Sequence, residues 1–239
     1  MAEIQYSFAR YEKKYFLTPQ QQEAVMEGLR PHMRADEYGS YTICNLYYDT
    51  PDWRLIRASI EKPAYKEKLR VRSYGVPAQD GTVFVEIKKK CEGVVYKRRI
   101  CADVRLAAKD LPRAAMMQGG QIGREIGWFL HTYPVSPRVF LAYDRTAFAG
   151  VEDPELRVTF DRNIRWRDTA LDLRLGSMGA PLGPQDRILM ELKLPGVCPL
   201  WLSRLLSEVG AFPTSFSKYG AYYCEEIIKT TPKEARYSA

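Results

Sequence analysis

Residues 65–74, YKEKLRVRSY, alternate cationic and apolar side chains over consecutive positions. Successive side chains of a β-strand point to opposite faces, so one face would carry Lys66, Lys68, Arg70 and Arg72. The opposite face would carry Leu69 and Val71. This stretch therefore predicts a strand with aligned cations on one side and an apolar surface on the other.

The following segments repeat the pattern. Residues 83–90, VFVEIKKK, would place Glu86, Lys88 and Lys90 on one face, opposite a row of Val and Ile. The pair Glu92-Gly93 is a turn signal that predicts an antiparallel hairpin to the next strand, which would carry Lys97 and Arg99 on one face. Similar polar stripes recur along the chain: Arg10, Glu12 and Lys14; Arg145; Arg157, Thr159 and Asp161; Glu191 and Lys193.

Period-two alternation and β-forming residues predict about eight strands in an α+β fold. The expected strands are residues 6–16, 41–49, 64–74, 82–91, 94–101, 138–148, 155–165 and 186–194. Thr18-Pro19 is a helix start signal, and an apolar stripe follows it to about Met33. Further helices are expected at 51–61, 120–132, 198–209 and 215–229.

The charged stripes have two interpretations. A single stripe opposite an apolar face normally marks a half-buried strand whose polar face meets water. The stripes together favour an inward orientation, because carboxylates recur beside the cations and a row of like charges needs an anion to offset its repulsion. The sequence then predicts an antiparallel barrel with a polar lumen, apolar outer faces and covering helices, wide enough for one slender ligand.

Composition limits the remaining possibilities. The chain has 239 residues, 46% of them hydrophobic, and a net charge of +7, so we expect one globular domain, residues 1–229, that attracts anions, and a polar tail, residues 230–239. No segment is apolar enough to span a membrane, and the N-terminus has no signal-peptide pattern, which favours a cytoplasmic location. The five cysteines and two histidines are not spaced like metal ligands, so neither a zinc site nor a disulfide framework is expected.

An ordered set of motifs carries a family resemblance: R-x-E-x-K-Y (10–15), Y-Y-D-T (47–50), K-L-R-V-R-S-Y-G (68–75), V-E-I-K-K-K (85–90), K-R-R (97–99), Y-D-R-T-A-F (143–148), L-R-V-T-F-D (156–161), M-E-L-K (190–193) and S-K-Y (217–219). This set resembles the VTC domain, the catalytic domain of the vacuolar transporter chaperone polyphosphate polymerases. The motifs extend over nearly the whole chain and are specific through their common order.

The resemblance implies a triphosphate tunnel metalloenzyme fold of the CYTH-like superfamily, an eight-stranded antiparallel β-barrel with helices outside. It implies transfer of the γ-phosphate of ATP to inorganic polyphosphate with Mn²⁺ or Mg²⁺. By motif position, the phosphate-binding residues would be Lys14, Lys68, Arg70, Arg72, Lys88, Lys97, Arg145, Arg157, Lys193 and Lys218. Five of these would also be catalytic: Arg70, Arg72, Lys88, Arg145 and Lys218.

By the same resemblance, Glu191 would be the leading metal ligand, with Glu12 and Glu86 as further candidates. Other tunnel metalloenzymes begin with E-x-E-x-K, whereas Arg10 occupies the first acidic position here, so one metal ion is expected rather than two.

Two alternatives stay open. The same cation-lined tunnel with water as the phosphate acceptor would make a triphosphatase, acting on nucleoside or inorganic triphosphate. A non-catalytic polyphosphate-binding module would use the basic charge alone. Binding of nucleic acid is not expected, because the cations alternate with carboxylates instead of forming a purely basic outer surface.

Overall fold

The computed structural model describes residues 11–61, 63–92 and 94–229. The strands are β1 (Tyr11–Leu17), β2 (Met33–Asp49), β3 (Tyr65–Tyr74), β4 (Thr82–Cys91), β5 (Val94–Asp103), β6 (Ser136–Gly150), β7 (Arg157–Arg167), β8 (Ala180–Pro181), β9 (Ile188–Leu194) and β10 (Pro213–Thr214). The helices are α1 (Pro19–Leu29), α2 (Arg54–Glu61), α3 (Val104–Lys109), α4 (Leu111–Met117), α5 (Gly120–Thr132), α6 (Leu200–Glu208), α7 (Lys218–Tyr222) and the short η1 (Leu173–Leu175) and η2 (Tyr223–Ile228).

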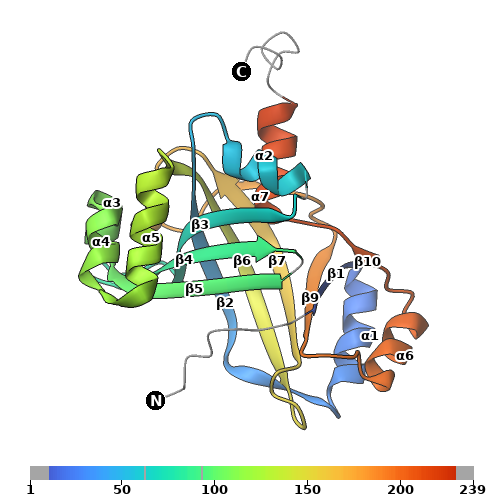
Figure 1. The fold of residues 1–239 in the computed structure, drawn as a ribbon. Coiled ribbons are helices and arrows are strands. Elements are labelled where there is room, and N and C mark those ends of the chain that lie inside the picture. Colours follow the sequence, from blue (N-terminus) through green and yellow to red (C-terminus); the bar gives the residue numbers. More distant parts are fainter. Residues whose placement is uncertain (1–10, 62, 93, 230–239) are drawn as a thin grey trace.

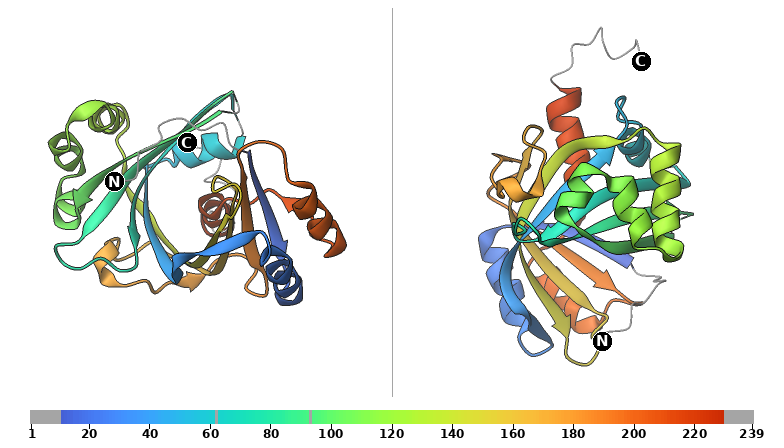
Figure 2. Two further views of the ribbon diagram at one scale, coloured as in Figure 1. Left: turned by 90° about the horizontal axis from the view of Figure 1, so that it is seen from below. Right: turned by 90° about the vertical axis from the view of Figure 1, so that its left-hand side faces the viewer.

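All strands join one antiparallel sheet in the order β10-β1-β9-β7-β6-β2-β3-β4-β5, with β8 paired to β7. The sheet curls strongly, so that its two ends approach one another (Figure 2, left). Between the described residues of β1 and β5 there is no backbone pairing, and the barrel keeps a seam there. The predicted α+β fold with eight long antiparallel strands is confirmed. The predicted antiparallel hairpin of β4 and β5 forms, with Cys91 opposite Val94, and Gly93 lies outside the described residues.

The apolar faces of the strands point outward, as the alternation predicted. Leu69, Val71 and Ile87 belong to a buried cluster that includes Ala115 and Phe129 from the helices. Helices α3, α4 and α5 therefore cover the outer face of β3, β4 and β5 (Figures 1 and 2). Burial of this surface drives the helices onto the sheet and leaves the polar face for the interior.

A second apolar cluster covers the opposite wall. Val158 on β7 and Leu192 on β9 pack with Val25 and Leu29 of α1 and with Leu202 of α6. Figure 1 shows α1 and α6 side by side over this wall. The barrel is thus enclosed by helices on two sides, and the cationic stripes face inward.

A third cluster fills one end of the barrel interior. Leu141 and Leu189 from the strands meet Ile56 of α2 and Tyr219 and Tyr222 of α7. Helices α2 and α7 lie together at this end in Figure 1. The polar part of the interior is therefore bounded at one end by an apolar plug.

The helix boundaries differ in part from the sequence-based expectations. Thr18 caps α1 as predicted, with its side chain accepting the Gln21 N–H, but the helix ends at Leu29 and not near Met33. Met33 instead starts the long strand β2, since its backbone pairs with Gly150 of β6. Helices α3 and α4 were not predicted, because each is too short to show an apolar periodicity, although Asp103 and Asp110 cap their first turns.

The expected helix 215–229 starts at Lys218, where Ser217 accepts the Gly220 N–H. The predicted polar tail, residues 230–239, lies outside the described residues. In the part of the chain that the structure covers, no helix combines the length and apolar character that a membrane span requires.

Candidate phosphate-binding site

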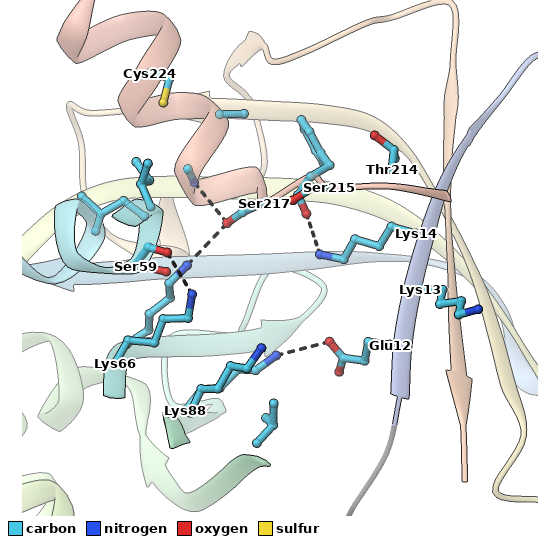
Figure 3. A pocket seen from close by; sticks show the side chains of 18 of the residues that line it. Glu12, Lys13, Lys14, Ser59, Lys66, Lys88, Thr214, Ser215, Ser217 and Cys224 are labelled. Atoms are coloured by element: carbon cyan, nitrogen blue, oxygen red, sulfur yellow. Dashed lines mark hydrogen bonds and ion pairs between the residues drawn. The ribbon is translucent and has the colours of Figure 1, made fainter. Parts of the chain in front are cut away.

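A cavity of about 880 Å³ opens where β1 faces β3 and β4, next to α2 and α7. Its lining includes Lys14, Lys66, Lys68, Lys88 and Lys90. Figure 3 shows Lys66 and Lys88 reaching into the cavity from one side and Lys14 from the other. Several ammonium groups therefore share one concave space, which suits a polyanion.

Further inside, Glu86 is the centre of a cation cluster. Arg70 binds its carboxylate through Nε at 2.8 Å and Nη2 at 2.7 Å, and Lys97 Nζ lies 2.8 Å from Oε1. Arg72 Nε lies 3.8 Å away, and the Glu86 side chain is only 1% exposed. Burial alone would raise the pKa of Glu86, but these three cations outweigh burial and lower it. The Glu86 carboxylate is thus already paired with cations of the protein.

Arg72 is fixed by neutral groups of the neighbouring strands. Its Nε donates to Asn45 Oδ1 at 2.8 Å and its Nη2 to the Tyr143 hydroxyl at 3.2 Å. Asn45 in turn donates to the Leu141 carbonyl at 3.1 Å. Its hydrogen-bond partners are uncharged and it shares the single Glu86 carboxylate with Arg70 and Lys97, so the Arg72 guanidinium keeps positive charge available to an anionic ligand.

Asp161 anchors a second cluster. It accepts Arg145 Nε and Nη2 at 2.6 and 2.8 Å, and Lys218 Nζ at 2.6 Å. Its side chain is fully buried at 0% exposure, and although burial raises the pKa of Asp161, Lys218 and Arg145 lower it overall. The sequence placed Asp161 in a polar stripe but assigned it no role, since its partners are set by strand register.

Glu191 has a different environment. Lys193 Nζ lies 3.7 Å and Lys14 Nζ 3.9 Å from its carboxylate oxygens, beyond hydrogen-bond distance, and its side chain is 12% exposed. Opposite Glu191 on β7 is Thr159, whose buried Oγ1 has no hydrogen-bond partner among the described residues. Burial raises the pKa of Glu191, but the surrounding cations lower it overall, led by Lys193 and Lys14. Glu191 is therefore an ionised carboxylate with oxygens available to a ligand.

Glu12 belongs to the seam. Its carboxylate lies 3.4 Å from Lys88 Nζ, so that an ion pair joins β1 to β4 where no backbone pairing does. Figure 3 shows this pair at the edge of the cavity. The predicted ligands Glu12, Glu86 and Glu191 do not come together, since the described residues contain no group of three His, Cys, Asp or Glu side chains that could hold a metal ion.

Nine of the ten predicted phosphate ligands take part in these interior contacts. Lys68 donates to Ser217 Oγ at 3.4 Å, and Lys14 donates to the Phe216 carbonyl at 2.7 Å. The tenth, Arg157, lies opposite Lys193 in the register of β7 and β9 and is exposed at the first residue of β7. The sequence therefore identified the cations of the interior, whereas it gave no signal that Arg145 and Lys218 pair with Asp161.

Partial burial inside the barrel changes the protonation of the interior lysines. Burial lowers the pKa of Lys97 to about 7 and the pKa of Lys68 to about 8. The pKa values of Lys14 and Lys193 are lowered for the same reason. A partly buried ammonium loses its proton more easily than one in water, so these groups would gain from a bound anion.

A curled antiparallel sheet with a cation-lined interior, apolar outer faces and covering helices defines a tunnel-type barrel. The model of the VTC domain family matches residues 9–225, and this chain belongs to that family.

Solved structures show the same fold at low sequence identity. The Hippeastrum protein HpAC1, an adenylyl cyclase candidate described as having a dominant triphosphatase activity, has a TM-score of 0.54 at 15% identity, covering 90% of this chain and 96% of its own. A candidate adenylate cyclase from Bacillus halodurans has a TM-score of 0.54 at 12% identity, covering 98% and 100%. A comparison with curated proteins found no match.

Proposed function

We propose that this chain is a metal-dependent phosphotransferase that moves the γ-phosphate of ATP onto an inorganic polyphosphate chain. The excess of positive charge on the inner wall carries the proposal. The described residues that make the ionic and phosphate-site contacts given above comprise nine cations and four carboxylates, which leaves five positive charges when all are ionised: Lys14, Lys68, Arg70, Arg72, Lys88, Lys97, Arg145, Lys193 and Lys218 against Glu12, Glu86, Asp161 and Glu191. An excess of this size within one partly enclosed space is offset best by a ligand with several negative charges.

Two neighbouring regions support transfer between two phosphate chains. The inner clusters supply arginine side chains, whose planar forks suit phosphate oxygens. The cavity at the seam is lined by lysines and shares Lys14, Lys68 and Lys88 with the predicted phosphate ligands. The inner region would hold the triphosphate of the donor and the cavity would hold the acceptor chain. Phosphoryl transfer needs this positioning and charge neutralisation rather than a nucleophilic side chain.

The residues fit a divalent ion held by one carboxylate. Mg²⁺ and Mn²⁺ prefer oxygen ligands and are often bound by one or two carboxylates together with substrate phosphates and water. Glu191 meets this requirement, because its oxygens accept no hydrogen bond from the described side chains. The bound ion would neutralise charge on the phosphate oxygens. Glu86 is a weaker candidate, since three cations already surround it.

Hydrolysis is the second candidate. HpAC1, whose structure is similar, is described as having triphosphatase activity. The same interior cations could equally well bind a triphosphate whose terminal phosphate is attacked by water. The two reactions differ only in what attacks the terminal phosphate.

Incubation of the purified chain with ATP and Mn²⁺ tests the proposal. We expect long-chain polyphosphate on a gel, and its loss in Glu191→Gln and Arg70→Ala. Arg187→Ala, a matched loss of an arginine whose side chain is 41% exposed, should keep the activity. Free phosphate without polymer would identify a triphosphatase. Binding of polyphosphate without turnover would identify a binding module.

A further inference from the structure

The motif Tyr47 to Thr50 has no role in the proposed function, although it lies within the barrel wall. Strand β2 places Tyr47 directly opposite Arg70 of β3, and Arg70 is opposite Glu86 of β4. Residues opposite one another in neighbouring strands point to the same face of the sheet. The Tyr47 side chain therefore points into the interior with the two charged groups, and it is only partly buried there.

The Tyr47 hydroxyl completes the environment of Arg70. It accepts a hydrogen bond from Arg70 Nη1 at 3.0 Å, whereas Nε and Nη2 of the same guanidinium bind Glu86. One edge of the arginine is thus held by a carboxylate and the other by a phenol. Loss of the phenol would leave the guanidinium free to turn about the Glu86 contact.

The ring of Tyr47 is held as firmly as its hydroxyl. It stacks on Tyr219 with centroids 4.6 Å apart and planes inclined by 22°. The Tyr219 hydroxyl donates to the buried Asp49 carboxylate at 2.7 Å, and this carboxylate also accepts the N–H groups of Leu55 and Ile56. Two of the family-like motifs, 47–50 and 217–219, therefore meet to fix one tyrosine next to one arginine.

The Tyr47 hydroxyl has hydrogen-bonding capacity to spare. A phenol accepts and also donates, and the proton of Tyr47 finds no acceptor among the described residues. Nearby cations add a further effect. Burial raises the pKa of Tyr47, but Arg70, Arg72 and Lys68 together lower it to about 8. A phenol in such surroundings is a strong donor toward a negatively charged oxygen.

We propose that Tyr47 is a phosphate-binding residue of the tunnel, which orients Arg70 and donates its own hydroxyl proton to an oxygen of a bound triphosphate or polyphosphate. The ligand class rests on the proposed function. The role of Tyr47 rests on the Arg70 contact, the stacking on Tyr219 and the unused donor.

The test compares Tyr47→Phe with the wild-type chain in calorimetric titrations with inorganic tripolyphosphate at neutral pH without metal. Removal of a hydrogen bond to a charged ligand should weaken binding at least about tenfold. Tyr48→Phe is the matched control, because Tyr48 lies on the opposite face in the outer apolar cluster. It should bind tripolyphosphate like the wild-type chain.

A spectroscopic titration shows whether the bound ligand acts on Tyr47 itself. In a Tyr143→Phe background, Tyr47 is the remaining described tyrosine whose pKa is lowered, so its phenolate absorbance can be followed. A ligand that accepts the Tyr47 proton should move this titration to higher pH. This measurement also decides the question if Tyr47→Phe does not fold.

Unchanged affinity in Tyr47→Phe, or a phenol titration that tripolyphosphate leaves in place, would overturn the role of Tyr47 while the proposed function stands. Absence of tripolyphosphate binding by the wild-type chain would overturn both.

Discussion

Asp161 accepts both hydrogen bonds of the Arg145 guanidinium, Nε at 2.6 Å and Nη2 at 2.8 Å, and it also accepts Lys218. Replacement of this fully buried carboxylate leaves two interior cations without a counter-charge. Removal of one partner from a buried ion pair typically costs about 3–5 kcal/mol. We therefore expect Asp161→Ala to lower the free energy of unfolding by about that amount, measured by urea denaturation.

Tripolyphosphate should restore part of the stability that Asp161→Ala loses, because its oxygens can replace the missing carboxylate. Asp186→Ala is the control, since Asp186 is 76% exposed, and it should leave the unfolding free energy unchanged. An Asp161→Ala chain as stable as the wild type would show that Arg145 and Lys218 are solvated rather than enclosed.

Triphosphate binding should weaken as the pH rises through about 7 to 8. The pKa values of Lys97 and Lys68 are about 7 and 8, so both lose positive charge in this range when no ligand is present. A bound anion raises both pKa values, and binding should therefore take up protons. Calorimetry in buffers of different ionisation enthalpy measures this uptake.

Lys97→Arg provides the control for this pH dependence, since arginine stays charged throughout the range. Its binding curve should be flatter with pH than that of the wild type. The ligand-free chain should show the opposite trend, because a lysine with a lowered folded-state pKa adds stability as the pH rises from about 7 toward its unfolded value. Affinity that stays constant from about pH 6.5 to 9 would contradict the lowered pKa values.

The features that follow from local sequence were predictable. The eight strands, their antiparallel hairpins and the outward apolar faces follow from period-two alternation, which depends on neighbours in the chain. The start of α1 follows from the Thr18 cap. In contrast, β2 starts at Met33 because residues 33–35 pair with β6, which no local pattern reveals.

The same distinction applies to the site. The cations were identified because each lies in a recognisable stripe, but which carboxylate each one meets depends on how distant strands align. Glu86 and Glu191 have similar positions in their strands, yet one is enclosed by Arg70 and Lys97 and the other keeps free oxygens. That both carboxylates bind metal stays a prediction. Because their surroundings differ, mutation of Glu86 and mutation of Glu191 should have different effects.

Glu191→Gln and Glu86→Gln should separate metal binding from folding. Glu191→Gln removes the carboxylate with available oxygens, so Mn²⁺ should no longer tighten tripolyphosphate binding, while the thermal stability changes little. Glu86→Gln takes the counter-charge from Arg70, Arg72 and Lys97, and it should lower the stability of the ligand-free chain markedly. Thermal denaturation and calorimetry with and without Mn²⁺ measure both effects. A Glu191→Gln chain that keeps its Mn²⁺ response would remove this residue from the metal site.

Two glycines of α5 should respond in opposite directions to the same substitution. An added Cβ at Gly123 would lie 2.6 Å from the backbone carbonyl oxygen of Ala115, whereas a Cβ at Gly127 would meet no atom within 4 Å. Gly123→Ala forces α4 and α5 apart and should cost about 1–3 kcal/mol. Gly127→Ala should stabilise the chain by about 0.5–1 kcal/mol through helix propensity alone. Urea denaturation of the two variants measures the difference, and a stabilising Gly123→Ala would mean that the helices covering β3, β4 and β5 pack less closely than described.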